Sequence, residues 1–389
     1  MLELGFEVKE VVEGRARLLV PKGVGEVDPS KLPAFYNPAS KISRDIAVLV
    51  TSAFFSGDGK TFAEPLAGLG ARSVRLLLES GVFSEGRACD INENSARLIS
   101  VNARLNGLEG RLRAHHMDAN VFLSTIAAER QKVHYVDLDP SGSPVRFLEG
   151  SLRALLPGGL LGVSATDLAA LSGASPRTAL WRYGIRLTRT VFRKEVALRA
   201  LTAVAVMAAS RLSRSAVPVF ALIHRHFARV FLTVRRGKIG AYRSVSQLGY
   251  LKYCNSCLNV ERVEQLLGSS EWCGRCGSQA SLLGPIWLGP LQDSELVSRV
   301  LSSELIEDET FEEAKDLLVH ISQEPSEIPY SYPVSELSRR ARCSPSSPKV
   351  IVARLREMGY RASVAHYDRG AIKTDAPLDL LYELVRSPS

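Results

Sequence analysis

Short apolar runs alternate with helical patterns between residues 60 and 165. Five runs have the length and apolar content of β-strands, and they cover residues 61–67, 86–91, 112–117, 133–138 and 160–165. Residues 73–79 and 93–105 instead repeat their apolar positions with a helical period. The run at 133–138 is almost wholly apolar, as expected of a parallel strand that is buried on both faces. Repeated strand–helix units predict an α/β fold with a doubly wound, mostly parallel sheet.

Further elements are expected on both sides of this region. We expect a helix over residues 43–55, and another that Ser143 caps, with Pro144 at its first position and an end at Pro157-Gly158-Gly159. A helix is also expected near residues 194–212. Two apolar runs, at 217–224 and 228–235, are so close that they predict an antiparallel hairpin at the edge of the sheet.

The last hundred residues have a different pattern. Residues 284–290 (GPIWLGP) resemble a rigid connector. Two helices are expected at 333–342 and 348–358, and two short strands follow near 361–366 and 371–374. A helix pair followed by a hairpin predicts a winged-helix-like module.

Composition and charge narrow the class of protein. The chain has 389 residues, 46% of them hydrophobic and 23% charged, which is typical of a globular protein. It has no apolar run long enough for a membrane helix and no signal-peptide pattern, so we expect a cytoplasmic protein. The net charge is +8, yet the stretch Arg177–Lys238 alone holds 14 basic residues and one acid. Such a stretch favours a polyanion partner, and a merely solvated basic face is the alternative.

Four of the six cysteines follow the pattern C-x2-C-x15-C-x2-C, and they are Cys254, Cys257, Cys273 and Cys276. Two such pairs supply the four thiolates of a closed, structural zinc site. The alternatives are a redox pair and a chance spacing. The pattern therefore predicts a zinc ribbon.

Glycines and acids mark the ends of the first three predicted strands. The glycine-rich loop EPLAGLG follows the first strand, and Asp90 ends the second, where an acid can bind ribose hydroxyls. The loop lacks the G-x-G-x-x-G fingerprint of a pyrophosphate site, so S-adenosylmethionine fits better than a dinucleotide. Asp118 and Ala119 follow the third strand. There the carboxylate either accepts from the adenine amine of that cofactor or caps the next helix.

Asp139 and Pro140 follow the fourth strand in the sequence DLDPSG. Ligands of such sheets bind beyond the carboxyl ends of the strands, so we expect Asp139 to face the crevice and Pro140 to stiffen its loop. A carboxylate that accepts the N–H bonds of an exocyclic amine helps to localise its lone pair for attack on a sulfonium methyl group. This arrangement favours an amine methyltransferase, and the alternative is a purely structural turn.

Four motifs occur in order along almost the whole chain. They are FYNP with SRD (35–38, 43–45), DLDPSGSP with LRA, PGG and ATD (137–167), GPIWLGP (284–290) and GAIKTDAP (370–377). In this order they resemble the tRNA guanine-N2 dimethyltransferase family, which modifies guanine 26 of tRNA. The resemblance implies a class I (Rossmann-like) methyltransferase domain and a smaller α+β C-terminal domain. We accordingly expect four segments: a 1–60 extension contributing to the active site, a 61–245 methyltransferase domain, a 246–285 zinc-ribbon insert and a 286–389 winged-helix-like domain.

The resemblance also implies roles for single residues. Asp139 matches the residue that engages the guanine amine, and Phe35 matches an aromatic residue of the base pocket. The residues that match S-adenosylmethionine contacts are Arg44, Arg72, Asp90, Asp118 and Ala119. The chain departs from the family at Ser141, where an aromatic residue is usual, so we expect Phe35 to carry more of the stacking on the base.

The sequence thus predicts an enzyme that transfers methyl groups from S-adenosylmethionine to N2 of guanine 26 in tRNA. We expect tRNA as partner, no membrane and no obligate protein partner. One alternative is an amine methyltransferase for another tRNA position or for ribosomal RNA. Another is a non-catalytic zinc-ribbon and winged-helix factor that binds nucleic acid, but this class leaves the acids at the strand ends unexplained.

Overall fold

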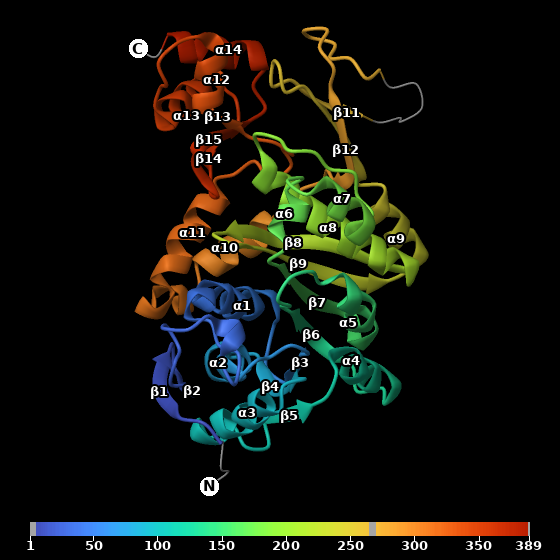
Figure 1. Ribbon diagram of the computed structural model, residues 1–389, viewed down its shortest axis with the longest axis vertical. Coiled ribbons are helices and arrows are strands. Elements are labelled where there is room, and N and C mark those ends of the chain that lie inside the picture. Colours follow the sequence, from blue (N-terminus) through green and yellow to red (C-terminus); the bar gives the residue numbers. More distant parts are fainter. Residues whose placement is uncertain (1–4, 264–269, 388–389) are drawn as a thin grey trace. The chain divides into compact units, whose positions relative to one another are not determined.

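The computed structural model of the chain describes residues 5–263 and 270–387 (Figure 1). Contacts between residues group into two compact units. Unit 1 consists of Met1–Ser164, Phe231–Arg236 and Ser294–Asp316, and unit 2 consists of Ala165–Val230, Gly237–Asp293 and Leu317–Ser389. The four-segment division expected from the sequence stays a prediction.

A seven-stranded sheet has the order β5-β4-β3-β6-β7-β9-β8. Its strands are β3 (Lys60–Glu64), β4 (Phe83–Asp90), β5 (Leu112–His116), β6 (Val133–Leu138), β7 (Leu155–Ala165), β8 (Arg214–His224) and β9 (Phe227–Arg236). The pairs β3–β4, β3–β6, β4–β5 and β6–β7 are parallel. Only two residues join β8 to β9, so these strands form the expected antiparallel hairpin at one edge. The chain order reverses between β3 and β6, where α/β sheets of this kind bind their ligands.

Helix α1 (Lys41–Phe54) precedes the sheet, as the sequence predicts, and further helices follow its parallel strands. They are α2 (Ala71–Glu79), α3 (Glu93–Leu105), α4 (Ala119–Ala128), α5 (Leu148–Ala154) and, after β7, the short α6 (Leu168–Leu171) and α7 (Pro176–Thr178) and the predicted α8 (Arg193–Arg211). Asn92 caps α3 as expected, because its side chain accepts from the backbone N–H of Ser95 at 3.0 Å. In β6 the side chains of Tyr135, Val136 and Leu138 are fully buried, which confirms the prediction of a parallel strand covered on both faces.

Two local predictions are wrong. The helix expected from Pro144 to residue 157 is a 3₁₀ turn, η3 (Val145–Phe147), followed by the short α5. Strand β7 begins at Leu155 and contains Pro157-Gly158-Gly159, because Gly158 adopts a positive φ of 84° that accommodates an irregular pairing with β6. The expected connector at 284–290 begins within strand β12 (Ser281–Trp287) instead.

The N-terminal segment belongs to unit 1. It forms the antiparallel hairpin β1 (Val8–Glu13) and β2 (Ala16–Pro21), and two 3₁₀ turns, η1 (Pro29–Lys31) and η2 (Pro38–Ser40), lead into α1. Unit 1 also holds α10 (Ser294–Leu301), η5 (Glu304–Glu307) and η6 (Glu309–Phe311). α11 (Glu312–Ser322) begins there and ends in unit 2.

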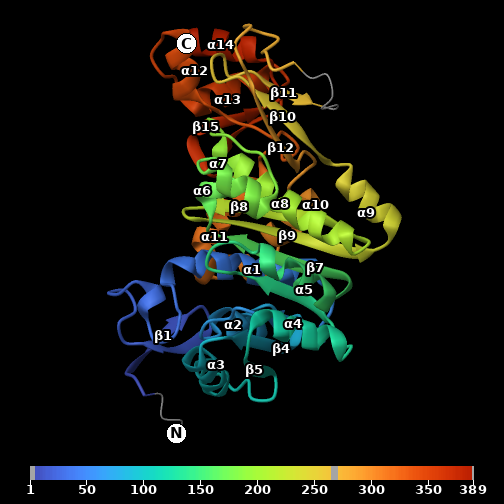
Figure 2. The same cartoon turned by 45° about the vertical axis from the view of Figure 1, so that its right-hand side comes forward.

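Unit 2 contains two further three-stranded sheets. The first has the order β11-β10-β12, with β10 (Leu248–Tyr253) and β11 (Val260–Val263), and follows α9 (Lys238–Val245). The second has the order β13-β15-β14 and is built from β13 (Tyr332–Pro333), β14 (Ala362–Ala365) and β15 (Asp368–Thr374). Its helices α12 (Val334–Ala341), α13 (Pro348–Glu357) and α14 (Leu378–Arg386) gather at one end of the unit (Figure 2). The predicted helix pair and hairpin are therefore present, and β13 and α14 are additional elements.

None of the helices in the described part of the chain is long and apolar enough to span a membrane.

Candidate functional site

Four carboxylates lie at the carboxyl ends of neighbouring parallel strands in unit 1. Glu64 ends β3, Asp90 ends β4, Asp118 lies two residues after the end of β5, and Asp139 follows β6 directly. The register brings these ends level, since Ala63 of β3 pairs with Val136 of β6. The sheet therefore presents these side chains along one edge, as the sequence predicts.

Arg72, a buried arginine in the first turn of α2, connects strands β3 and β6 with helix α1. Its side chain is only 4% exposed. Its Nη1 donates to Asp137 Oδ1 at 2.7 Å and to Glu64 Oε1 at 3.2 Å, and its Nη2 donates to Ser43 Oγ at 3.1 Å and to Asp139 Oδ2. Asp139, whose side chain is 23% exposed, is thus held through one carboxylate oxygen. The predicted cofactor residue Arg72 and the predicted catalytic residue Asp139 are in direct contact.

Three carboxylates around one guanidinium leave an excess of negative charge. Burial raises the pKa of Glu64, and the nearby Asp137 and Asp139 raise it further, while Arg72 lowers it. The same carboxylates hold the pKa of the Arg72 guanidinium above its usual range, although burial opposes them. The arginine is therefore a permanent cation at the base of the site.

Asp90 and Phe35 meet at the glycine-rich loop after β3. The backbone N–H of Gly68 donates to Asp90 Oδ2 at 2.8 Å, and that of Asn92 donates to Oδ1 at 2.8 Å. Burial raises the pKa of Asp90, and these backbone donors counter it. A Cβ on Gly68 would lie 2.7 Å from the carbonyl oxygen of Phe35, so only glycine permits this close approach. The Phe35 side chain is 46% exposed beside the loop.

Arg44 lies in a second buried network, which holds the FYNP segment. Its Nε donates to Glu13 Oε1 at 2.6 Å, and its Nη2 donates to the carbonyl oxygen of Asn37 at 3.2 Å. Tyr36 donates its hydroxyl to Glu13 Oε2 at 2.8 Å, and Arg75 Nη1 donates to Glu13 Oε1 at 3.1 Å. Burial alone raises the pKa of Glu13, but Arg44 and Arg75 bring it down to about 2.

Sequence reasoning missed both Glu13 and Arg75. The sequence held a signal for Arg75, because Arg72 and Arg75 stand three residues apart in a helical run that also contains Val74 and Leu76–Leu78. Arginines at such positions face the core and require buried acids as partners. The identity of those acids had no local signal, since Glu13 lies 62 residues from Arg75.

Asp118 caps α4 in the structure. Its Oδ1 accepts from the backbone N–H groups of Asn120, at 2.8 Å, and of Val121, at 3.3 Å. Ala119 is the first residue of this helix and is buried. The bonds described for Asp118 use only Oδ1, and none of them joins it to Arg72, Asp90 or Asp139. The capping alternative is therefore realised, and a role towards adenine stays a prediction.

The loop after Asp139 has a buried and an exposed half. Pro140 is buried, whereas Ser141 is exposed. Gly142 follows with a φ of 106°, a conformation that suits glycine. Ser141 therefore occupies a surface position that could accept a larger side chain.

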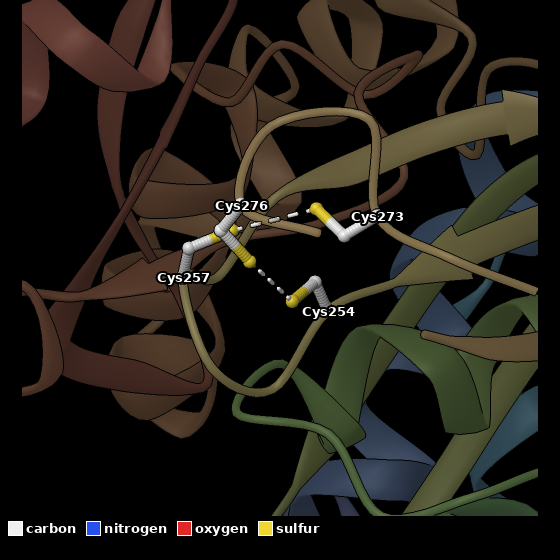
Figure 3. Close-up of side chains that lie close together, drawn as sticks. All are labelled: Cys254, Cys257, Cys273 and Cys276. Carbon is white, nitrogen blue, oxygen red and sulfur yellow. Dashed lines mark hydrogen bonds between the residues drawn. The ribbon is translucent and has the colours of Figure 1, made fainter. Parts of the chain in front are cut away.

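The four predicted cysteine ligands come together in unit 2 (Figure 3). All four sulfur atoms lie within 4.8 Å of one another. Cys254 Sγ is 3.5 Å from Cys276 Sγ, and Cys257 Sγ is 3.6 Å from Cys273 Sγ. A tetrahedral metal with Zn–S bonds of about 2.3 Å needs sulfurs about 3.8 Å apart. The cluster thus has the donor set and the spacing of a four-thiolate metal site.

The motifs GPIWLGP and GAIKTDAP meet at buried charges on α8. Arg199 is fully buried and donates to the carbonyl oxygens of Trp287, at 3.0 Å, and of Gly289, at 2.9 Å. Glu195 accepts from Arg199 Nε at 2.8 Å and from Lys373 Nζ at 3.1 Å. These motifs therefore have a structural role within unit 2.

The basic residues of the stretch Arg177–Lys238 fall into a buried and an exposed group. Arg199 and Arg229 are fully buried and Arg214 is 6% exposed, so these three cannot form a solvated basic face. Exposed members remain both before and after α8, and those before it include Arg177, Arg186 and Arg189. Only part of the stretch is available to a polyanion.

The strand order, with acids at the carboxyl ends of β4, β5 and β6, defines a class I (Rossmann-like) methyltransferase. The family model for N2,N2-dimethylguanosine tRNA methyltransferase matches residues 14–386. The chain belongs to this family.

Named relatives match over almost their whole length. The tRNA (guanine(26)-N(2))-dimethyltransferase of Methanopyrus kandleri is 35% identical over 95% of this chain and 94% of its own. A tRNA (guanine(26)-N(2)/guanine(27)-N(2))-dimethyltransferase of Aquifex aeolicus is 33% identical over 88% of each chain. Among solved structures, Trm1 from Pyrococcus horikoshii in complex with S-adenosyl-L-methionine has a TM-score of 0.85 and 30% identity, over 97% of this chain and 99% of that one.

Proposed function

We propose that this protein transfers methyl groups from S-adenosylmethionine to the exocyclic N2 of guanine 26 in tRNA. The observation that carries the proposal is the contact between buried Arg72 and Asp139 at the carboxyl end of β6. Family membership and the S-adenosylmethionine complex of a relative of the same fold support it. The cytoplasm is the compartment that we propose for this reaction.

The glycine loop and its neighbours would hold the cofactor. S-adenosylmethionine, when bound, supplies a methyl group on a positively charged sulfur. Backbone N–H groups fix both oxygens of Asp90, and the carboxylate would accept from a ribose hydroxyl with its remaining acceptor capacity. Without a side chain at Gly68, the backbone of Phe35 can lie directly against this loop. We assign Asp118 and Ala119 to the adenine end and Arg44 to the support of the neighbouring FYNP segment.

Asp139 would act on the guanine amine. A carboxylate that accepts an N–H bond of this amine weakens the conjugation of its lone pair with the ring and stabilises the positive charge that develops on nitrogen. The ion pair with Arg72 fixes the direction of the carboxylate. Pro140 restricts the loop, so the geometry is set before the substrate binds.

Phe35 would support the guanine ring. The target amine is hidden in stacked tRNA, so the base has to leave the stack to react. A half-exposed aromatic ring beside the glycine loop offers a face for such a base. With Ser141 in place of a second aromatic residue, Phe35 would supply most of the stacking.

The cysteine cluster would bind zinc as a structural metal. Four thiolates leave no open coordination position for catalysis. Zinc bound there would tie together the loops that follow β10 and precede β12.

The test is methylation of purified tRNA transcripts by the full-length protein, with nucleosides identified by mass spectrometry. We expect N2-methylated guanosine that disappears when guanine 26 is replaced by adenine. Asp139→Asn should lower turnover by on the order of 100-fold or more, since a charged group at the reacting atom is lost. The matched control is Asp58→Asn, an exposed carboxylate in the loop before β3, which should retain full activity.

Two outcomes would reject the proposal. Methylation that persists in the adenine-26 transcript points to another tRNA position, and methylation of ribosomal RNA alone points to another substrate. Near-normal turnover of Asp139→Asn rejects the role of that carboxylate.

A further inference from the structure

A five-residue π-helix in unit 2, η4 (Ala179–Tyr183), carries an exposed indole. Trp181 is 69% exposed and the preceding Leu180 is 55% exposed. Tryptophan usually buries most of its large apolar ring, and exposed tryptophans are enriched where proteins bind partners. π-helical turns also occur frequently at functional sites. This turn has no role in the chemistry described above.

The turn that carries Trp181 is firmly anchored. Arg182 forms an ion pair with Asp167, and the hydroxyl of Tyr183 donates to Asp167 Oδ2 at 3.4 Å. Tyr183 is 4% exposed and Ile185 is fully buried, so the residues after the indole are packed into the unit. The indole is therefore presented on a rigid support, and little conformational entropy would be lost if a ligand bound to it.

One face of the indole is already covered. The guanidinium carbon of Arg182 lies 4.6 Å from the centre of the Trp181 ring. A cation in this position is attracted by the ring, and the ion pair with Asp167 keeps it there. Since most of the side chain is exposed, the open surface of Trp181 is its opposite face.

In the sequence around the indole, basic residues outnumber acids. No acid occurs between Asp167 and Glu195, whereas this interval holds six basic residues: Arg177, Arg182, Arg186, Arg189, Arg193 and Lys194. A protein-binding patch is normally poor in charge at its centre and larger than two apolar side chains. An aromatic face among arginines is instead the arrangement that binds single-stranded nucleic acid, with bases stacked on rings and phosphates beside cations.

We propose that the open face of Trp181 stacks on an unpaired nucleobase of the tRNA, with Arg177 and Arg186 near the adjoining phosphates. The inference rests on the proposed function, because it takes tRNA as the nucleic acid. It assigns to Trp181 a binding role that is separate from the reacting guanine and from Phe35.

The chain offers a matched control for this proposal. Trp272 is 61% exposed on the cysteine ribbon, where it follows Glu271, and Lys252, which donates to its backbone carbonyl at 3.4 Å, is itself paired with Glu261. Trp287 is buried and gives a constant fluorescence background. Three variants therefore separate stacking by Trp181 from the general effect of removing an exposed indole. They are Trp181→Ala, Trp181→Phe and Trp272→Ala.

We expect Trp181→Ala to weaken tRNA binding about 5- to 150-fold, the range that corresponds to loss of one base stack. Trp181→Phe should recover most of the affinity, and Trp272→Ala should retain it. The affinity for S-adenosylmethionine should not change in any variant. With saturating tRNA, Trp181→Ala should keep its kcat, so the defect falls on KM. In the Trp272→Phe variant, tRNA should quench the tryptophan fluorescence that remains. The double variant Trp272→Phe, Trp181→Phe should no longer show this quenching.

Several results would overturn the inference. Unchanged tRNA affinity of Trp181→Ala would do so, and so would unchanged quenching after removal of Trp181. If Trp181→Ala loses S-adenosylmethionine binding as well, the fold is damaged, and the quenching experiment decides alone. A lower oligomeric state of Trp181→Ala than of the wild type in sedimentation, with tRNA affinity retained, would make this patch a protein interface. Failure of the proposed function looks different, because the wild-type protein itself would then leave guanine 26 unmethylated.

Discussion

Replacement of Glu13 by glutamine tests whether the buried network organises the FYNP segment. Glu13 accepts from Arg44, Arg75 and Tyr36 and is 5% exposed. Its pKa falls from 4.5 to about 2 in the folded protein. At 1.36 kcal/mol per pKa unit, ionised Glu13 contributes about 3 kcal/mol to the folded state. This value agrees with the roughly 3–5 kcal/mol that loss of one partner costs in a buried pair.

Hydrogen–deuterium exchange of peptides covering residues 8–54 measures this loss locally. A change of about 3 kcal/mol corresponds to roughly 100-fold faster exchange by local opening. Glu13→Gln should show this effect and should also lower methylation, because Phe35 and Tyr36 lose their support. The control is Glu10→Gln on the same strand, whose partner Arg17 is exposed and whose loss should matter little.

The pH dependence supplies a second, signed test. A carboxyl group whose folded pKa is lowered stabilises the fold above its unfolded pKa, and this contribution is lost as the pH falls towards the folded pKa. The wild-type segment should therefore lose protection between about pH 4.5 and 2. Glu13→Gln should lack this component. Equal exchange in Glu13→Gln and Glu10→Gln, or an unchanged acid slope, would refute the reasoning.

Three further predictions concern the metal, the base and the RNA surface. Cys273→Ser should release zinc, as measured by atomic absorption, and loosen the ribbon while the methyltransferase sheet stays folded. The prediction would be contradicted if wild-type protein purified without chelators contained no zinc. Phe35→Ala should reduce turnover severely, whereas Ser141→Phe should be tolerated or should tighten tRNA binding. A mild Phe35→Ala defect in steady-state kinetics would mean that the base is held elsewhere. Binding of tRNA should weaken steeply with salt. Replacement of Arg186 and Arg189 by glutamine should reduce that salt slope without changing cofactor affinity, and an unchanged slope would exclude these two residues as phosphate contacts.

Local patterns were sufficient to predict much of the fold. The apolar run of β6, the Asn92 cap and the hairpin β8–β9 depend on neighbouring residues, and the structure contains all three. The cysteine spacing likewise predicted the cluster, because each C-x2-C pair forms one tight turn. Local periodicity failed where tertiary pairing competes with it. The sequence 155–159 pairs with β6 as part of β7, although its proline and glycines indicate the end of a helix.

The sequence alone determined which residues stand at the strand ends, since strand boundaries place Asp90, Asp118 and Asp139 at one edge of any parallel sheet. Only the tertiary structure decided which groups neutralise them. Arg72 reaches Asp139 across 67 residues of chain. Nothing in the local pattern specifies such a partner, because a buried charge is satisfied by whichever opposite charge the fold brings within hydrogen-bonding distance. For the same reason the sequence revealed a basic stretch, and only the packing of α8 and the edge strands separated its buried arginines from those that remain available to RNA.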